Sequence, residues 1–203
     1  ATAGSTFAWT RAAVIGISQA ATLGTAGVNE VLTNTTTAPI VVTYLYTTTA
    51  NGCSNVPQAV TVTVNPVPVL SSTLTPAAIC SSTTFSYTPT SATAGATFTW
   101  SRALVAGISQ IASSGVGPVN EALTNTTTAP IVVTYIYTIS ANGCSAPENV
   151  TVTVNPIPTL TSSLTPPAIC SAATFTYTPT SGVVGATFSW SRALVAGISQ
   201  AAS

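Results

Sequence analysis

The sequence is almost without charge. Only 3% of its 203 residues are charged, and it contains no Lys, Asp, His or Met. A nucleic-acid-binding protein needs a basic surface to neutralise phosphates, so that class is excluded. Acid–base catalysis and metal binding depend chiefly on His, Asp, Lys and clustered Cys. We therefore predict that the protein is not an enzyme and has no catalytic residues, cofactor or metal site.

Long apolar runs are also missing. The mean hydropathy is +0.53, yet Thr, Ser, Asn or Pro interrupts every apolar run before it reaches the roughly 18 residues of a membrane-spanning helix. The sequence thus predicts no membrane span. Thr and Ser together number 63, and the apolar residues form short Val, Ile, Thr and Tyr strings. This is the composition of β-strands.

The chain repeats itself with a period near 90. Trp9, Trp100 and Trp190 follow one another at steps of 91 and 90 residues, and the 27 residues beginning at Val28 and at Val119 differ at only four positions. Such a period matches one independent β domain. Cutting at the proline-rich stretches that follow each "VTVTVN" yields three regions. They are a partial first repeat (1–65, its C-terminal two-thirds), a complete middle repeat (66–155) and a partial third repeat (156–203, its N-terminal half).

Within the middle repeat, apolar residues alternate as they do in strands packed on one face. "TFSYTP", "ATFTWSR", "PIVVTYIYT" and "NVTVTVNP" each carry this pattern, and Asn142-Gly143 is suited to a tight hairpin turn. About seven short strands with a tryptophan on an early central strand indicate an immunoglobulin-like β-sandwich. The predicted fold is all-β: tandem immunoglobulin-like β-sandwiches joined by short proline-containing linkers. Tyr135 is either part of a tyrosine corner or an ordinary core residue.

The few charged residues recur at fixed spacing. Arg102 shares its strand face with Trp100, and Glu121 follows it by 19 residues, as Glu30 follows Arg11. We predict one structural ion pair in each of these repeats, Arg11–Glu30 and Arg102–Glu121, while Arg192 would meet a glutamate outside the chain. The alternative is that the arginine binds a ligand. Glu148 is expected in a solvated turn.

Two cysteines in each period favour disulfides over a metal site, because zinc sites usually need four clustered Cys or His ligands. Two schemes remain open. Cys80 pairs with Cys144 inside one repeat, with Cys53 and Cys170 bonded to residues outside the chain; or Cys53–Cys80 and Cys144–Cys170 join neighbouring repeats. Domain autonomy favours the first scheme. An ordinary immunoglobulin topology, however, would place Cys80 and Cys144 toward opposite ends.

Three Asn-x-Thr sequons are candidate glycan acceptors, at Asn34, Asn125 and Asn149. A sugar coat would keep such an uncharged surface hydrated. The competing interpretation of the repeated "LTNTTTAP" is a polar turn that leads into a strand.

The motifs together point to a known group. "AIC", "F-x-W-S-R", "NE-x-LTNTT", "V-x-Y-x-YT", "ANGC" and "VTVTVNP-x-P" resemble the PKD-like and Ig-like tandem repeats of large secreted bacterial surface proteins, known best from Bacteroidetes adhesins. The resemblance covers the whole chain. It implies an extracellular, cell-surface stalk, adhesin or filament, and it transfers no catalytic or binding residue.

The predicted function is therefore a non-catalytic structural repeat, whose partners are neighbouring repeats or identical subunits in a filament. Near-identical copies suit a spacer, which gains reach by duplication. One alternative is a glycan-binding adhesin module, with Tyr46 and Tyr137 as contacts if they are exposed. Another is a pilus-type subunit that polymerises by strand exchange, an idea prompted by repeats that are incomplete at both ends of the sequence.

Overall fold

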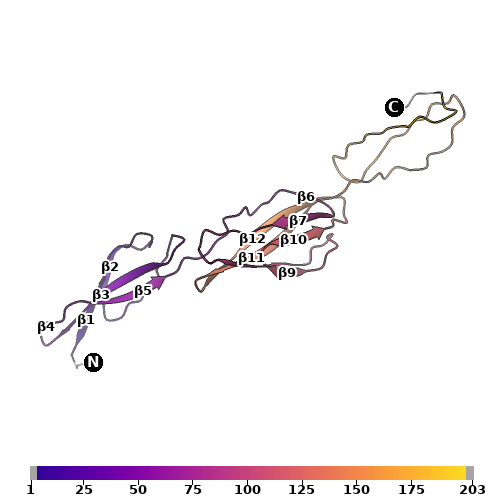
Figure 1. Cartoon of the computed structure of the whole chain (residues 1–203). Helices are drawn as coiled ribbons and strands as arrows, with labels where there is room; N and C mark the ends of the chain where they lie inside the picture. The colour runs from indigo at the N-terminus through magenta and orange to yellow at the C-terminus, as the bar shows by residue number, and fades with distance from the viewer. Residues whose placement is uncertain (1–3, 200–203) are drawn as a thin grey trace.

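The three repeats lie in a row. A computed structural model describes residues 4–199, and all of its regular elements are β-strands. Figure 1 shows the first, middle and third repeats end to end, with the two termini at opposite ends of the row. Within the described range there is no helix long and apolar enough to cross a membrane.

The first repeat is a single sheet. Its strands are β1 (Thr6–Arg11), β2 (Thr22–Thr25), β3 (Ile40–Ala50), β4 (Cys53–Ser54) and β5 (Gln58–Val64). They pair in the order β2-β1-β3-β4, and β5 also pairs with β3. All pairs are antiparallel. No second sheet covers this one among the described residues.

The middle repeat is a complete sandwich. Its strands are β6 (Ile79–Cys80), β7 (Thr83–Tyr87), β8 (Thr97–Arg102), β9 (Ser113–Val116), β10 (Val119–Leu123), β11 (Ile131–Ala141) and β12 (Cys144–Asn155). Five of them form one sheet in the order β6-β12-β11-β8-β9, and β10 pairs with β7 in the other. The short β6 runs parallel to the end of β12. The predicted all-β sandwich is confirmed for this repeat.

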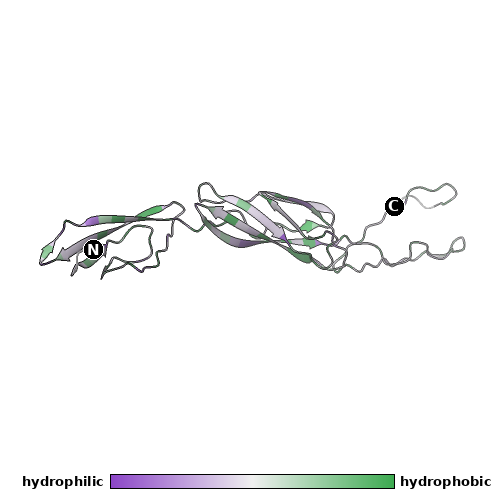
Figure 2. Ribbon diagram, turned by 90° about the horizontal axis from the view of Figure 1, so that it is seen from below, coloured by the Kyte–Doolittle hydropathy of each residue, from purple (hydrophilic) through white to green (hydrophobic). Residues whose placement is uncertain are grey.

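Strand alternation builds its core. Bands of hydrophobic and hydrophilic residues alternate along the strands (Figure 2), and the inward positions of β11 and β12 are fully buried. These positions are Val133, Tyr135, Tyr137, Ile139, Val150, Val152 and Val154. Across the sandwich, Phe85 of β7 lies 5.2 Å from Tyr135 between ring centroids, and Tyr87 lies 5.4 Å from Tyr137. The β7 aromatics thus close the core over the larger sheet.

A tight turn joins β11 to β12. Asn142 and Gly143 adopt φ values of 51° and 78°, the left-handed region that this hairpin turn requires and that Asn and Gly tolerate best. The predicted hairpin is confirmed.

The third repeat has no strand between residues 156 and 199; a single bridge joins Leu160 to Ser181. Its aromatic residues lie open to solvent: Phe175 is 54% exposed and Trp190 is 79% exposed. Its "ATFSWSR", the counterpart of the strand predicted over "ATFTWSR" in the middle repeat, therefore forms no strand. A strand needs a neighbour for its backbone hydrogen bonds, and none is present there.

The link between the first and middle repeats is packed. The side chain of Asn65 donates a hydrogen bond to the carbonyl of Asn142 (2.7 Å), while Pro66 and Pro68 are buried. Proline has a fixed φ, and a buried proline has little freedom to move. The hairpin of the middle repeat therefore rests directly on the end of the first repeat.

Candidate functional site

A buried ion pair occupies one end of the middle sandwich. Arg102, at the end of β8, is 1% exposed, and its Nε lies 3.0 Å from Oε2 of Glu121 on β10. Its Nη2 also donates to the Ile111 carbonyl at 2.6 Å. The carboxylate accepts further bonds from Ser113 and Tyr135, both at 2.6 Å. The pair connects the two sheets, because β8 and β10 belong to different ones.

The same cluster recurs in the first repeat. Arg11 is 1% exposed, and its Nη2 lies 2.7 Å from Oε1 of Glu30. Tyr44 donates to the other oxygen at 2.6 Å. Both predicted ion pairs are thus present. Both guanidinium groups are fully buried and bonded to glutamate and backbone carbonyls, so neither arginine is accessible to an external ligand.

Electrostatics in the cluster favour the charged pair. Burial alone raises the pKa of Glu121, but hydrogen bonds from Arg102, Ser113 and Tyr135 outweigh it and leave that pKa below its usual value. Burial, followed by the adjacent carboxylate, raises the pKa of Tyr135 well above its usual value. The cluster stays ionised as Arg⁺–Glu⁻ with a neutral tyrosine at neutral pH, which suits cross-linking of the core rather than proton transfer.

The tyrosines on β11 serve this core and do not form a tyrosine corner. Tyr135 bonds to Glu121, and Tyr137 donates to the Gly117 carbonyl 20 residues upstream at 3.2 Å. The corner motif bonds to backbone only a few residues upstream. Tyr137 is fully buried, which rules it out as an exposed platform for a sugar.

The asparagines of two sequons, Asn34 and Asn125, make structural hydrogen bonds, as the polar-turn interpretation predicts, and a glycan at either stays a prediction. Asn125 is 7% exposed, and its Nδ2 donates to the carbonyls of Ala129 (2.8 Å) and Val154 (2.9 Å). Its Oδ1 accepts from the backbone and hydroxyl of Thr127. Asn34 makes the equivalent bonds to Ala38 and Val64. At both asparagines the amide nitrogen already donates to two backbone carbonyls, and a glycan would replace one of the hydrogens that make these bonds.

Asn149 differs from the other two. It lies on β12 opposite Ile136 and is exposed. Its candidacy as a glycan acceptor remains a prediction.

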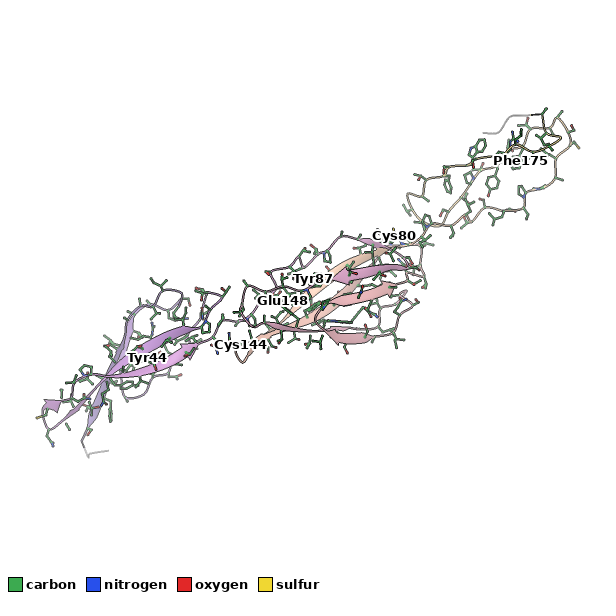
Figure 3. The ribbon with its side chains drawn as sticks, viewed as in Figure 1. Tyr44, Cys80, Tyr87, Cys144, Glu148 and Phe175 are labelled. Atoms are coloured by element: carbon green, nitrogen blue, oxygen red, sulfur yellow. The ribbon has the colours of Figure 1, made fainter. Side chains whose placement is uncertain are left out.

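The intra-repeat disulfide Cys80–Cys144 is wrong in this structure. Cys80 pairs with Asn155 at one end of β12, while Cys144 begins that strand at the other end. Eleven residue steps along a strand span about 36 Å, whereas the Cα atoms of a disulfide lie within about 7 Å. Figure 3 shows the two at opposite ends of the repeat. All four cysteines are free thiols.

Glu148 is not in a solvated turn. It lies within β12 opposite Tyr137, and its Oε2 accepts a hydrogen bond from the backbone of Leu70 at 3.0 Å. The prediction failed because the turn ends earlier than expected: β12 begins at Cys144, directly after the two-residue hairpin. Glu148 fastens the segment that enters the middle repeat to its last strand.

The open face of the first repeat forms a groove of about 670 Å³, here termed the open groove. It is lined by Val28, Asn29, Glu30, Leu32, Tyr44, Tyr46, Val60, Val62, Thr63, Val64, Asn65 and Cys144. Val60 and Val62 are 51% and 43% exposed, while their counterparts Val150 and Val152 are fully buried.

The described residues hold no group of three or more His, Cys, Asp or Glu side chains that could bind a metal. A comparison with family models matches the PKD-like domain over residues 1–68 and again over residues 77–158. A search among curated proteins finds no match.

Proposed function

Because the chain belongs to the PKD-like domain family, we propose that it is a non-catalytic structural module of an extracellular stalk, adhesin or filament. Its repeats follow one another in a row (Figure 1), and the first and middle repeats each contain a buried ion pair and a core. A spacer of this kind acts through length and stiffness, so it needs no differentiated site.

The junction between the first and middle repeats is the observation that carries this proposal. Asn65 bonds to the hairpin of the next repeat, and the prolines after it are buried. A flexible Gly/Ser linker would let domains move independently, whereas this contact holds consecutive repeats in line. Stiffness of this kind is what a stalk requires.

Small-angle scattering and negative-stain imaging of the reduced, dilute chain test the proposal. We expect straight particles with one dominant angle between the first and middle repeats. A variant with Pro66→Gly and Pro68→Gly should broaden that angle while leaving both repeats folded. A broad distribution of angles in the unaltered chain would contradict the proposed role. Immunogold labelling of native cells tests the extracellular location.

A further inference from the structure

The turn at the junction between the first and middle repeats carries a reactive pair of residues. The main-chain carbonyl of Asn142 accepts the hydrogen bond from Asn65 (2.7 Å), and Gly143 follows it. Figure 3 labels Cys144, the next residue, where the middle repeat faces the first. The nitrogen of a glycine is the main-chain nitrogen that a preceding asparagine side chain reaches most easily, because glycine has no Cβ to shield it. In this sequence only Asn142 and Asn51 precede a glycine.

The side chain of Asn142 is free to react. Asn142 and Gly143 are both exposed, and a Cβ placed on Gly143 would meet no atom within 4 Å. Within the described residues the carboxamide of Asn142 makes no hydrogen bond; only its main-chain carbonyl does. The carboxamide of Asn125, by contrast, donates to the carbonyls of Ala129 and Val154. The side chain of Asn142 can therefore turn toward the nitrogen of Gly143, whereas that of Asn125 is held in place.

We propose that Asn142 is a site of spontaneous deamidation to isoaspartate, and that this modification loosens the junction between the first and middle repeats. The inference rests on the proposed structural function, since it takes the unmodified junction to be stiff. The contact that holds two repeats in line then has a limited lifetime, which is set by the chemistry of its own turn.

The reaction needs water as its only co-reactant. The nitrogen of Gly143 loses its proton and attacks Cγ of Asn142, which closes a five-membered succinimide ring. The side-chain nitrogen takes up the proton and leaves as ammonia. Water then opens the ring. Attack of water at Cγ gives aspartate, while attack at the main-chain carbonyl carbon gives isoaspartate, in which the peptide bond to Gly143 runs through the former side chain.

Isoaspartate changes the two features of the turn on which the junction depends. The main chain between Ala141 and Cys144 gains one CH2 group, so the two-residue loop no longer matches the register that pairs these two residues. The carbonyl of Asn142 that accepts from Asn65 becomes a carboxylate on a side branch, which the turn no longer holds beside Asn65. A chain of net charge +0 also gains a negative charge at a packed contact, where desolvating it costs free energy.

A second turn in the chain serves as a matched reference for the chemistry. Asn51 and Gly52 have the same φ values as Asn142 and Gly143, 51° and 78°, and both are exposed. They follow the end of β3, whose other end pairs with Val64 beside the junction. Deamidation of Asn51 should therefore proceed readily as well, but it should leave the angle between the first and middle repeats unchanged.

Ageing of the full chain tests the chemistry. After incubation of the reduced chain in warm, mildly alkaline buffer, mass spectrometry of peptides, with enzymatic methylation to mark isoaspartate, measures the modification at each asparagine. We expect several-fold more isoaspartate at Asn142 and Asn51 than at Asn125 and Asn149. Modification of Asn142 that is no faster than that of Asn149 would overturn the proposal.

Two variants test the consequence for the junction. Asn142→Gly and Asn51→Gly each lose one carboxamide, while glycine adopts the positive φ of the turn and keeps the main-chain carbonyl. Negative-stain imaging and small-angle scattering should show that ageing broadens the angle between the first and middle repeats in the unaltered chain and in Asn51→Gly. Aged Asn142→Gly should keep one dominant angle. The same response to ageing in both variants would contradict the proposal.

The outcomes separate the two proposals. If the fresh chain has one dominant angle and keeps it after Asn142 has become isoaspartate, this inference fails and the structural role stands. If the fresh chain already bends freely, the structural role fails, and the loosening proposed for Asn142 fails with it.

Discussion

The middle and third repeats carry nearly the same sequence and differ in structure. "TFTWSR" forms strand β8 in the middle repeat, while "TFSWSR" at residues 187–192 forms no strand. Phe85 is 2% exposed and Phe175 is 54% exposed. The cause lies further along the chain, because the middle repeat includes β11 and β12, on which β8 and β6 pair. The same residues thus form a strand only where neighbouring strands pair with them.

The first repeat marks the intermediate case. It has its ion pair and the β11–β12 equivalents, so its sheet forms. Without a β7 equivalent, however, Val28 and Leu32 are only partly buried. The two halves of the repeat therefore differ in how they fold. The strands of the long hairpin form a sheet without the β7 equivalent, whereas the strands that begin the repeat do not form without that hairpin.

The largest effect should come from the matched phenylalanines. Phe85→Ala removes a core ring from the middle repeat and should lower its free energy of unfolding by about 3–5 kcal/mol. Phe175→Ala in the dilute monomer should change it by less than about 0.5 kcal/mol, since exposed positions contribute little. Chemical denaturation of the reduced chain measures both. Similar losses of stability in the two variants would contradict the proposed difference between the two repeats.

Removing one partner of the ion pair should have the next largest effect. Arg102→Ala leaves Glu121 without its cation, at an expected cost of about 3 kcal/mol, the lower end for buried pairs, because Glu121 keeps 18% side-chain exposure. A double-mutant cycle with Glu121→Ala should show strong coupling, so that the two losses do not add. Additive losses would mean that the contact does not stabilise the repeat.

A third test contrasts two sequons. Asn125→Ala leaves the carbonyls of Ala129 and Val154 without their donor and should cost about 2–3 kcal/mol. Asn149→Ala, at an exposed strand position, should cost less than about 0.5 kcal/mol. Thermal unfolding distinguishes the two, and the mass of native protein reports any sugar at Asn149. A tolerated Asn125→Ala would remove the structural explanation of the repeated "LTNTTT".

The smallest effect should be the response to acid. The folded-state pKa of Glu121 is lowered, so its contribution to stability is complete above its unfolded pKa of about 4.3 and is lost as pH falls through the folded value. Stability measured by urea unfolding should therefore drop below about pH 4. Glu121→Gln should be less stable at neutral pH and show a shallower drop. An equally steep loss of stability in that variant would mean that a group other than Glu121 causes the acid response.

Much of the fold could be predicted because it repeats. Period-two alternation predicts the buried faces of β11 and β12, and the shared 19-residue spacing predicts both Arg–Glu pairs. The tyrosine that completes each cluster follows its glutamate by 14 residues in both repeats, so this signal was present as well. Alternation of apolar and polar residues shows which side of a strand is buried. A residue spacing that is the same in two repeats indicates that the same contact forms in both.

Other features could not be predicted in the same way. The buried role of Asn125 depends on the end of β12 reaching the turn, which is a long-range contact without a local pattern. For Cys80 and Cys144, domain autonomy favoured the wrong pairing, while the immunoglobulin topology correctly predicted positions at opposite ends of the repeat. The absence of strands in the third repeat depends on missing partners, which its own residues do not reveal.

Hydrogen exchange tests most directly whether a segment becomes a strand only where its neighbours pair with it. Amides of residues 84–87, which pair with β10, should be protected, while those of residues 174–177, which form no strand, should exchange rapidly. Equal protection of the two segments would contradict the account.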